Sequence, residues 1–244
     1  MGIKEPERSI LELRFAIFDW ELTSAMTATT VEEKLAQPLL FPGLTWEQFK
    51  TLEPMLDIPG VRLSFLDGIL EIQKMPGRKH ETAKGRIGAL VETYMMAAGI
   101  DFTPTESLTL ENESRLVKCE ADKSYELGTD GERPDLAIEV VVTSGPIDKL
   151  EAYKRLQIPE VWFLENSRLS LYALRQQAYE EIASSQLLPE LDIGLLVRCV
   201  NMPSHVEAIK EFQRAIDRDL QSKIDYTYPG LLKEVGYLAT MQRC

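Results

Sequence analysis

The sequence lacks a long apolar run. None of its hydrophobic stretches approaches the about 20 consecutive apolar residues that a membrane-spanning helix requires, so we expect no membrane span. The first residues also lack the unbroken apolar segment and small-residue cleavage site of a secretory signal, because charged residues are interspersed from the start.

Cysteine is scarce and positive charge is in deficit. The three cysteines, Cys119, Cys199 and Cys244, form neither a disulfide framework nor a C-x-x-C metal motif, which predicts a reducing, cytoplasmic setting. With 27 lysines and arginines against 39 acidic residues, the formal net charge is −12. That balance argues against a basic coat that binds nucleic acid over its whole surface, but it allows an enzyme that grips a few phosphates locally.

The length and composition suit one globular domain with appendages. The chain has 244 residues, of which 44% are hydrophobic. We expect an N-terminal extension over residues 1–25, a main domain over 26–203 and a helical tail over 204–244. The alternative for the first segment is an ordinary helix that packs on the domain. The tail contains a charged amphipathic stretch at 205–223, which could form a dimer interface or pack on its own domain.

The first half of the main domain reads as helix, hairpin and helix. Residues 44–56 predict a short helix capped by Thr45, and residues 61–75 alternate around Asp67-Gly68, a strong two-residue hairpin signal. Residues 80–99 predict an amphipathic helix that stops at Gly99. Its apolar face should contain Ile87, Leu90, Val91, Tyr94 and Met95.

The second half reads mainly as strands around one helix. Strand-like pieces lie at 107–111 and 115–127, followed by a loop at 128–134 and a dense β-branched run at 136–143. A helix at 147–156 and a strand at 160–165 complete a strand–helix–strand unit, which predicts a parallel pair with a right-handed crossover. Strands at 169–174 and 178–183 predict a meander at the edge of the sheet.

An acid interrupts the apolar run at 136–143. Alternate residues of a strand share a face, so Ala137, Glu139 and Val141 point one way, and the opposite face is wholly apolar and predicted to be core. A lone buried carboxylate is costly unless it is paired or bound to metal. Glu139 is therefore a candidate functional residue. The structural alternative is an edge strand that exposes Glu139 to solvent.

Two further charged residues give Glu139 a possible chemistry. Asp122 lies on a neighbouring strand-like piece, and Lys149 begins the helix that follows the Glu139 strand. Paired carboxylates hold Mg²⁺ through hard oxygen ligands, the metal lowers the pKa of a bound water, and a lysine supports developing negative charge. Taken singly, Asp122 could be a surface or turn residue, and Lys149 a solvated or salt-bridged lysine.

Five segments, in this order, resemble the Uma-type restriction endonucleases, a bacterial branch of the PD-(D/E)XK nuclease superfamily. They are RLSFLDGILEIQKM (62–75), HETAKGRIGALVETY (80–94), EADKSYEL (120–127), PDLAIEVVVTS (134–144) and KLEAYKRLQIPEVWFLE (149–165). The resemblance covers about residues 40–195. It implies an α/β fold: a restriction-endonuclease-like core with a mixed central β-sheet flanked by helices.

The resemblance also implies Mg²⁺-dependent hydrolysis of phosphodiester bonds, with Mn²⁺ as an alternative ion. Asp122 and Glu139 would be the metal ligands. Two departures from the family pattern bear on the site. The usual E-x-K motif would put lysine at Val141, so Lys149 on the following helix becomes the catalytic lysine, and the opening hairpin has Ser64 where an acid is common.

Residues around the helix at 80–99 extend the predicted site. In similar nucleases an acid on this helix helps to bind a second metal or to position water, which makes Glu81 a candidate catalytic residue. An acid in a first helical turn also suits the helix dipole, which is the structural alternative. Candidate substrate-binding residues, which would grip phosphates locally, are His80, Lys84, Arg78 and Lys154. The alternative is that the basic residues only form solvated helix faces and that His80 is a surface or hydrogen-bonded structural histidine.

Three functions compete at this point. The first is a Mg²⁺-dependent endonuclease that cuts nucleic acid, with DNA as the expected substrate and a homodimer as the expected assembly. The second is a catalytically inactive nuclease-fold module that binds nucleic acid or a protein partner. The third is a different metal-assisted phosphoester hydrolase, since no base-reading motif is present in the sequence.

Overall fold

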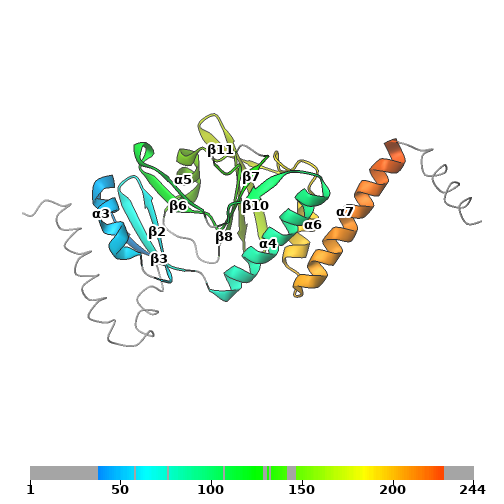
Figure 1. Cartoon of the computed structure of the whole chain (residues 1–244), viewed down its shortest axis with the longest axis horizontal. Helices are drawn as coiled ribbons and strands as arrows, with labels where there is room; N and C mark the ends of the chain where they lie inside the picture. The colour runs from blue at the N-terminus through cyan, green and yellow to red at the C-terminus, as the bar shows by residue number, and fades with distance from the viewer. Residues whose placement is uncertain are drawn as a thin grey trace, which may run out of the picture.

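The computed structural model describes residues 38–57, 59–75, 77–106, 108–128, 131, 133–141 and 147–227 (Figure 1). The predicted extension at 1–25 and the end of the predicted tail lie outside these ranges. Among the described helices, none has the length and apolar character that a membrane span needs. The described elements form two β-sheets and five α-helices.

The smaller sheet is antiparallel and five-stranded. Its order is β1 (Leu39–Phe41), β3 (Ile69–Lys74), β2 (Val61–Leu66), β6 (Val117–Glu120) and β5 (Thr109–Asn112). The predicted hairpin at 61–75 is confirmed as β2 and β3, with Asp67 at φ 51° and Gly68 at φ 83°. Positive φ at both turn residues is what a type I′ hairpin turn requires, which explains the Asp-Gly pair.

The larger sheet is mixed and six-stranded. Its order is β11 (Ala178–Ile182), β10 (Arg168–Arg175), β9 (Glu160–Glu165), β8 (Leu136–Val141), β7 (Lys123–Leu127) and β4 (Phe102–Pro104). Strands β8 and β9 are parallel, with Glu139 opposite Phe163, and the other pairs are antiparallel. The predicted parallel pair is confirmed, and helix α5 (Lys149–Leu156) lies between its two strands in the sequence.

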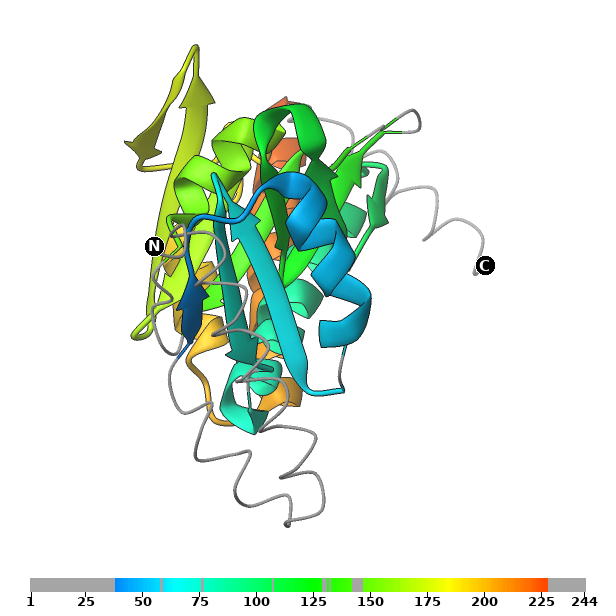
Figure 2. The ribbon, with the colours of Figure 1, turned by 90° about the vertical axis from the view of Figure 1, so that its left-hand side faces the viewer.

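Helices cover both faces of the larger sheet. Helices α4 (Arg78–Ala97), α6 (Ile193–Val200) and α7 (His205–Thr227) lie on one face and share a hydrophobic core with it (Figures 1 and 2). Helix α5 packs on the other face, in a core that also takes residues from β5 and β6. The predicted mixed sheet flanked by helices is confirmed, and the predicted apolar face of α4 is buried in the first core.

The smaller sheet has its own helical cover. Helix α3 (Trp46–Leu56) packs on the β2–β3 hairpin through Phe49, Phe65 and Leu70, which form a third apolar cluster with their neighbours. The helix begins as predicted, because Thr45 accepts a hydrogen bond from the Gln48 backbone in a capping box. The opposite face of the hairpin faces the larger sheet.

One prediction about the strands is wrong in a way that matters for the site. The sequence pattern predicted a single strand at 115–127, but the chain breaks at Ala121 and Asp122. The part before the break is β6 of the smaller sheet, and the part after it is β7 of the larger sheet. The break therefore lies where the chain crosses from one sheet to the other, and it places Asp122 at their junction.

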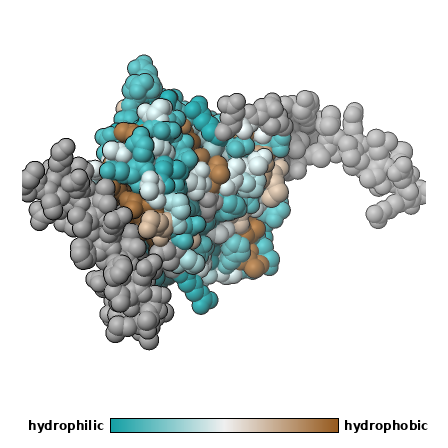
Figure 3. Space-filling model, turned by 60° about the vertical axis from the view of Figure 1, so that its left-hand side comes forward, coloured by the Kyte–Doolittle hydropathy of each residue, from teal (hydrophilic) through white to brown (hydrophobic). Residues whose placement is uncertain are grey.

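The first half of α7 packs on the domain. Ala208 and Phe212 of α7 are fully buried against α4 and α6. Arg86 of α4 donates from Nη1 to the backbone carbonyl of Val200 at 3.0 Å, which satisfies a carbonyl at the end of α6. The outer surface shown in Figure 3 is mostly hydrophilic, with small separate apolar patches.

Candidate active site

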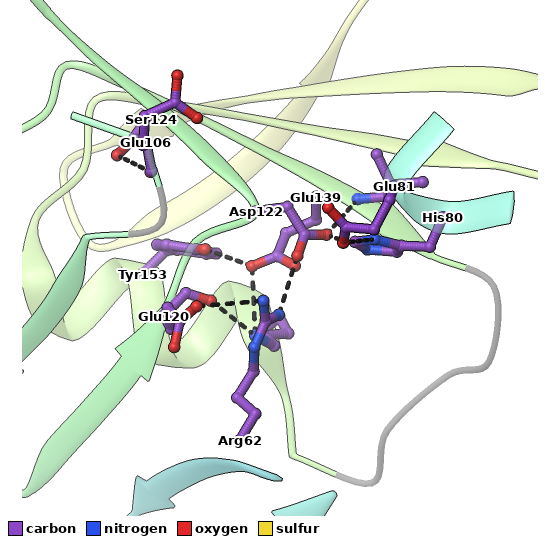
Figure 4. A network of polar contacts seen from close by, with 11 residues as sticks. Arg62, His80, Glu81, Glu106, Glu120, Asp122, Ser124, Glu139 and Tyr153 are labelled. Carbon is purple, nitrogen blue, oxygen red and sulfur yellow. Dashed lines mark hydrogen bonds and ion pairs between the residues drawn. The ribbon is translucent and has the colours of Figure 1, made fainter. Parts of the chain in front are cut away.

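The junction of the two sheets gathers the predicted acids. Asp122 occupies the break between β6 and β7, and Glu139 lies on β8. Strands β7 and β8 pair antiparallel with Lys123 opposite Ile138, so Asp122 and Glu139 are the next residues to face each other. Figure 4 shows their carboxylates side by side, with Arg62 below them and His80 to one side. The predicted pairing of these acids is thus present in the fold.

Asp122 is buried, with 1% of its surface exposed. Its Oδ1 accepts a hydrogen bond from Arg62 Nη1 at 2.9 Å, and its Oδ2 lies 2.8 Å from His80 Nε2 and 2.8 Å from the Val140 backbone nitrogen. Burial alone would raise the pKa of Asp122. The His80 hydrogen bond, the Arg62 charge and the Val140 N–H outweigh burial and hold that pKa well below its usual range.

Glu139 is the acid that the sequence placed in a strand of valines. It is 5% exposed and lies on the α5 side of the sheet, while its neighbours Ile138 and Val140 face the opposite core, as predicted. Its Oε1 accepts hydrogen bonds from Lys149 Nζ at 3.2 Å and from the Tyr153 hydroxyl. Burial raises the pKa of Glu139, and the charge of Lys149 only partly opposes the rise.

Helix α5 brings Lys149 to Glu139. The Asp148 side chain caps the helix by accepting a hydrogen bond from the Glu151 backbone nitrogen, and Lys149 is the first residue after the cap. Burial would lower the pKa of Lys149, but the Glu139 carboxylate raises it above its usual value and favours the ammonium form. The buried Glu71 of β3 accepts a hydrogen bond from the Ile147 backbone at 3.1 Å, which anchors the approach to this helix.

The sequence analysis missed Arg62. It lies on β2 with 4% of its surface exposed, and its guanidinium bridges Asp122 and Glu120, at 2.9 Å and 3.3 Å respectively (Figure 4). Burial would lower the pKa of Arg62, but the charges of Asp122 and Glu120 raise it. In the sequence, Arg62 lies two positions before Ser64, so the two residues share one face of the hairpin. The sequence alone did not show what this face packs against.

His80 joins helix α4 to the acids. It is 3% exposed, and its Nδ1 lies 3.0 Å from Glu81 Oε1 while its Nε2 faces Asp122. Ionised carboxylates only accept hydrogen bonds, so both ring nitrogens must carry protons for both contacts to be hydrogen bonds. Accordingly, although burial lowers it, the pKa of His80 is raised overall by Asp122 and Glu81. Glu81 thus reaches the acid pair through His80.

The predicted basic residues occupy different positions around the site. Arg78 is the exposed first residue of α4, two positions before His80, and Lys84 is half-buried one turn beyond His80. Lys154 of α5 forms an ion pair with Glu151 of the same helix, so an acid already balances its charge. The structure therefore gathers exposed positive charge at the start of α4 more clearly than on α5.

Two acids at the junction are candidate ligands for Mg²⁺. Among the described residues, no group of three or more histidine, cysteine, aspartate or glutamate side chains is placed to hold a metal ion. Mg²⁺, however, is commonly bound by one or two carboxylates, with waters and substrate phosphate as its other ligands. Asp122 and Glu139 supply two adjacent carboxylates, and both contacts of Glu139 with Lys149 and Tyr153 fall on Oε1.

Comparisons with known proteins identify one family and one similar solved structure. The family model of Uma2, described as "Putative restriction endonuclease", matches residues 46–198, which include every residue of the junction. A search of curated proteins finds no match. Among solved structures, a putative nuclease belonging to DUF820 from Anabaena variabilis matches with a TM-score of 0.44 and 15% identity. That match covers 65% of this chain and 99% of the other.

Proposed function

Since the chain belongs to the Uma2 family of putative restriction endonucleases, we propose that it is a Mg²⁺-dependent endonuclease that hydrolyses phosphodiester bonds of DNA. The observation that carries the proposal is the pairing of Asp122 and Glu139 at the sheet junction, with Lys149 Nζ 3.2 Å from Glu139 Oε1. Two adjacent acids and a charged lysine are the groups that metal-assisted phosphodiester hydrolysis needs.

Each residue of the junction has a distinct part in this proposal. Asp122 and Glu139 would hold the Mg²⁺ ion, which when bound would acidify a water and withdraw charge from the phosphate. Lys149 donates hydrogen bonds and, as an ammonium ion, stabilises negative charge that develops on phosphate oxygens. Its position on α5 lets it do so while it keeps Glu139 oriented through the contact at Oε1.

His80 and Tyr153 act as positioning residues in the same proposal. His80 donates to Asp122 Oδ2 and is itself held by Glu81, so that the carboxylate of Asp122 is fixed in orientation. Tyr153 lies one helical turn after Lys149 and is fully buried, and its hydroxyl donates a hydrogen bond to Glu139 Oε1. These contacts reduce the freedom of both acids before substrate arrives, which lowers the reorganisation needed for catalysis.

The proposal extends to where the protein acts and in which assembly. The scattered cysteines support a reducing cytoplasm, and we propose a homodimer because two active sites are needed to cut both strands of a duplex at once. DNA would approach over the start of α4, where Arg78 is exposed beside His80. Contacts from arginine to phosphate oxygens position a nuclease without reading sequence.

Cleavage of plasmid DNA by wild type and Glu139→Ala tests the proposal. We expect wild type to nick or linearise the plasmid with Mg²⁺ or Mn²⁺, and chelator to stop the reaction. Glu139→Ala should lose at least about 100-fold in rate, since a direct ligand is removed, while thermal unfolding shows that it still folds. Glu165→Ala, an exposed acid at the end of β9, is the matched control. Metal-dependent cleavage retained by folded Glu139→Ala would rule out the ligand role.

One observation favours a second function, an inactive nuclease-fold module that binds nucleic acid or a protein partner. Three cations, Arg62, His80 and Lys149, already surround the two acids and offset their charge. A wild-type protein that retards a DNA duplex in a gel, yet cleaves no nucleic acid with Mg²⁺ or Mn²⁺, would favour this function over the endonuclease.

A further inference from the structure

Arg62 has an unusual environment for an arginine. It projects from β2 of the smaller sheet into the junction, and 4% of its surface is exposed. Its Nη1 donates to Asp122 Oδ1 at 2.9 Å, and its Nη2 lies 3.3 Å from Glu120 Oε1 (Figure 4). A guanidinium remains charged at every pH at which proteins fold. A fixed positive charge therefore lies directly against one of the two carboxylates that would hold a metal ion.

The polar atoms around this contact are incompletely satisfied. Among the described residues, the buried polar atoms without a hydrogen-bond partner include Arg62 Nε and Ser64 Oγ. Arg62 and Ser64 lie two positions apart on β2, so they share the face that looks into the junction. Buried unpaired donors are rare and each one calls for an explanation. A ligand with several oxygen acceptors, such as a phosphate group, would satisfy both of them.

The charge of Arg62 opposes the binding of a metal ion. A divalent cation on Asp122 would lie close to the guanidinium, and two positive charges a few ångströms apart in a buried site repel strongly. The guanidinium also takes up one of the positions on Oδ1 that a metal ion would use. A phosphate group relieves this conflict, because its oxygens can accept from the guanidinium in the bidentate geometry that arginine favours.

We propose that Arg62 is a resident counter-ion of the acid pair that competes with the metal ion for Asp122 and transfers to the scissile phosphate when nucleic acid binds. Metal and nucleic acid then bind cooperatively, since the phosphate removes the cation that opposes the metal. By reciprocity the metal strengthens nucleic-acid binding by the same factor. This inference rests on the proposed function and assigns Arg62 the coupling between the two ligands.

Mn²⁺ affinity of the full chain, measured by calorimetry without nucleic acid, tests the inference. Arg62→Gln removes the charge, and we expect it to bind Mn²⁺ about tenfold more tightly than wild type. Arg62→Lys keeps a positive charge and should stay within about twofold of wild type. Arg198→Gln is the matched control, since Arg198 is 62% exposed on α6 and pairs with Glu211. Equal or weaker binding by folded Arg62→Gln overturns the inference.

A second measurement compares wild type with Arg62→Lys, in case Arg62→Gln does not fold. The Mn²⁺ affinity of wild type should rise about tenfold when a short DNA duplex is present at saturating concentration, and the rise should be much smaller for Arg62→Lys. An affinity that is independent of duplex overturns the inference. Tighter Mn²⁺ binding by Arg62→Gln without cleavage by any variant would support Arg62 as counter-ion while the nuclease proposal fails. Cleavage by wild type, together with a Mn²⁺ affinity that is unchanged in Arg62→Gln, would support the nuclease proposal and overturn the role of Arg62 as counter-ion.

Discussion

Two acids that face each other in this protein have opposite electrostatic environments. Asp122 receives donors from Arg62, His80 and the Val140 backbone, and its pKa lies well below the usual range. Glu139 is buried beside Lys149 and Tyr153, and its pKa is raised by burial. The difference follows from burial, which dominates at Glu139 and is outweighed at Asp122 by the contacts with His80, Arg62 and the Val140 N–H. Asp122 is therefore the acid that stays ionised.

The pH dependence of stability follows from the low pKa of Asp122. A carboxyl group whose pKa is lower in the folded than in the unfolded state stabilises the fold above its unfolded pKa, near 4, and this stabilisation is lost as the pH falls. We expect the urea midpoint of wild type to fall more steeply than that of Asp122→Asn as the pH falls below about 5. The measurement is urea unfolding at a series of pH values without metal. Parallel curves would show that Asp122 is not the stabilising group.

Lys149 offers a test that separates chemistry from metal binding. Since Lys149 supports charge in the transition state and is not expected to bind the metal, Lys149→Ala should slow cleavage by about 100-fold or more and change Mg²⁺ affinity far less. Single-turnover cleavage and calorimetry give the two numbers. Lys210→Ala, an exposed lysine of α7 paired with Glu207, is the control. Equal loss of rate and affinity would indicate a lysine that only maintains the structure of the site.

At the scale of elements, the cap of α5 determines where Lys149 lies. The Asp148 side chain fixes the first turn of this helix, and Asp192 does the same for α6, by accepting from the Leu195 backbone nitrogen. Loss of such a cap costs about 1 kcal/mol. The two caps differ in one respect that matters here, since only the one on α5 is followed directly by a residue of the candidate site.

The matched pair Asp148→Ala and Asp192→Ala tests this dependence. Both variants should lose about 1 kcal/mol of unfolding free energy, measured by urea denaturation. Asp148→Ala should in addition lose about tenfold in cleavage rate, because a fraying first turn lets Lys149 leave Glu139. Asp192→Ala should keep the wild-type rate. Equal rates in the two variants would mean that Lys149 is positioned by its contact with Glu139 alone.

Most helices and strands were predictable from the sequence, but the way they pack against one another was not. The Asp67-Gly68 turn, the apolar face of α4 and the β-branched run of β8 are local patterns, and the structure confirms all three. Glu139 stood out because an acid among valines breaks such a pattern. The role of Arg62 depends on how the β2–β3 hairpin faces β7 and β8, which no local pattern encodes. The short strands β1 and β4 and helix α6 were also missed.

The whole molecule combines an acidic body with a junction that draws on both sheets. Arg62 comes from the smaller sheet, Glu139 and Lys149 from the larger sheet and its crossover, and His80 from α4. Asp122 is the residue at which the chain passes between the sheets, so its contacts also hold the sheets together. A nucleic acid that reaches this junction must approach a protein with a net charge of −12. Only local positive charge can favour that approach.

The salt dependence of DNA binding therefore measures how local the contact is. Each phosphate that the protein neutralises adds about −0.9 to the slope of log affinity against log salt, so a patch at the start of α4 predicts a shallow slope. Arg78→Ala should reduce the slope by about 1, whereas Arg175→Ala, exposed at the end of β10, should leave it unchanged. Fluorescence anisotropy with a labelled duplex at several salt concentrations gives the slopes. An acidic body repels DNA at long range, so binding depends on local positive charge. A steep slope that is unchanged in Arg78→Ala would place the nucleic acid on another face of the protein.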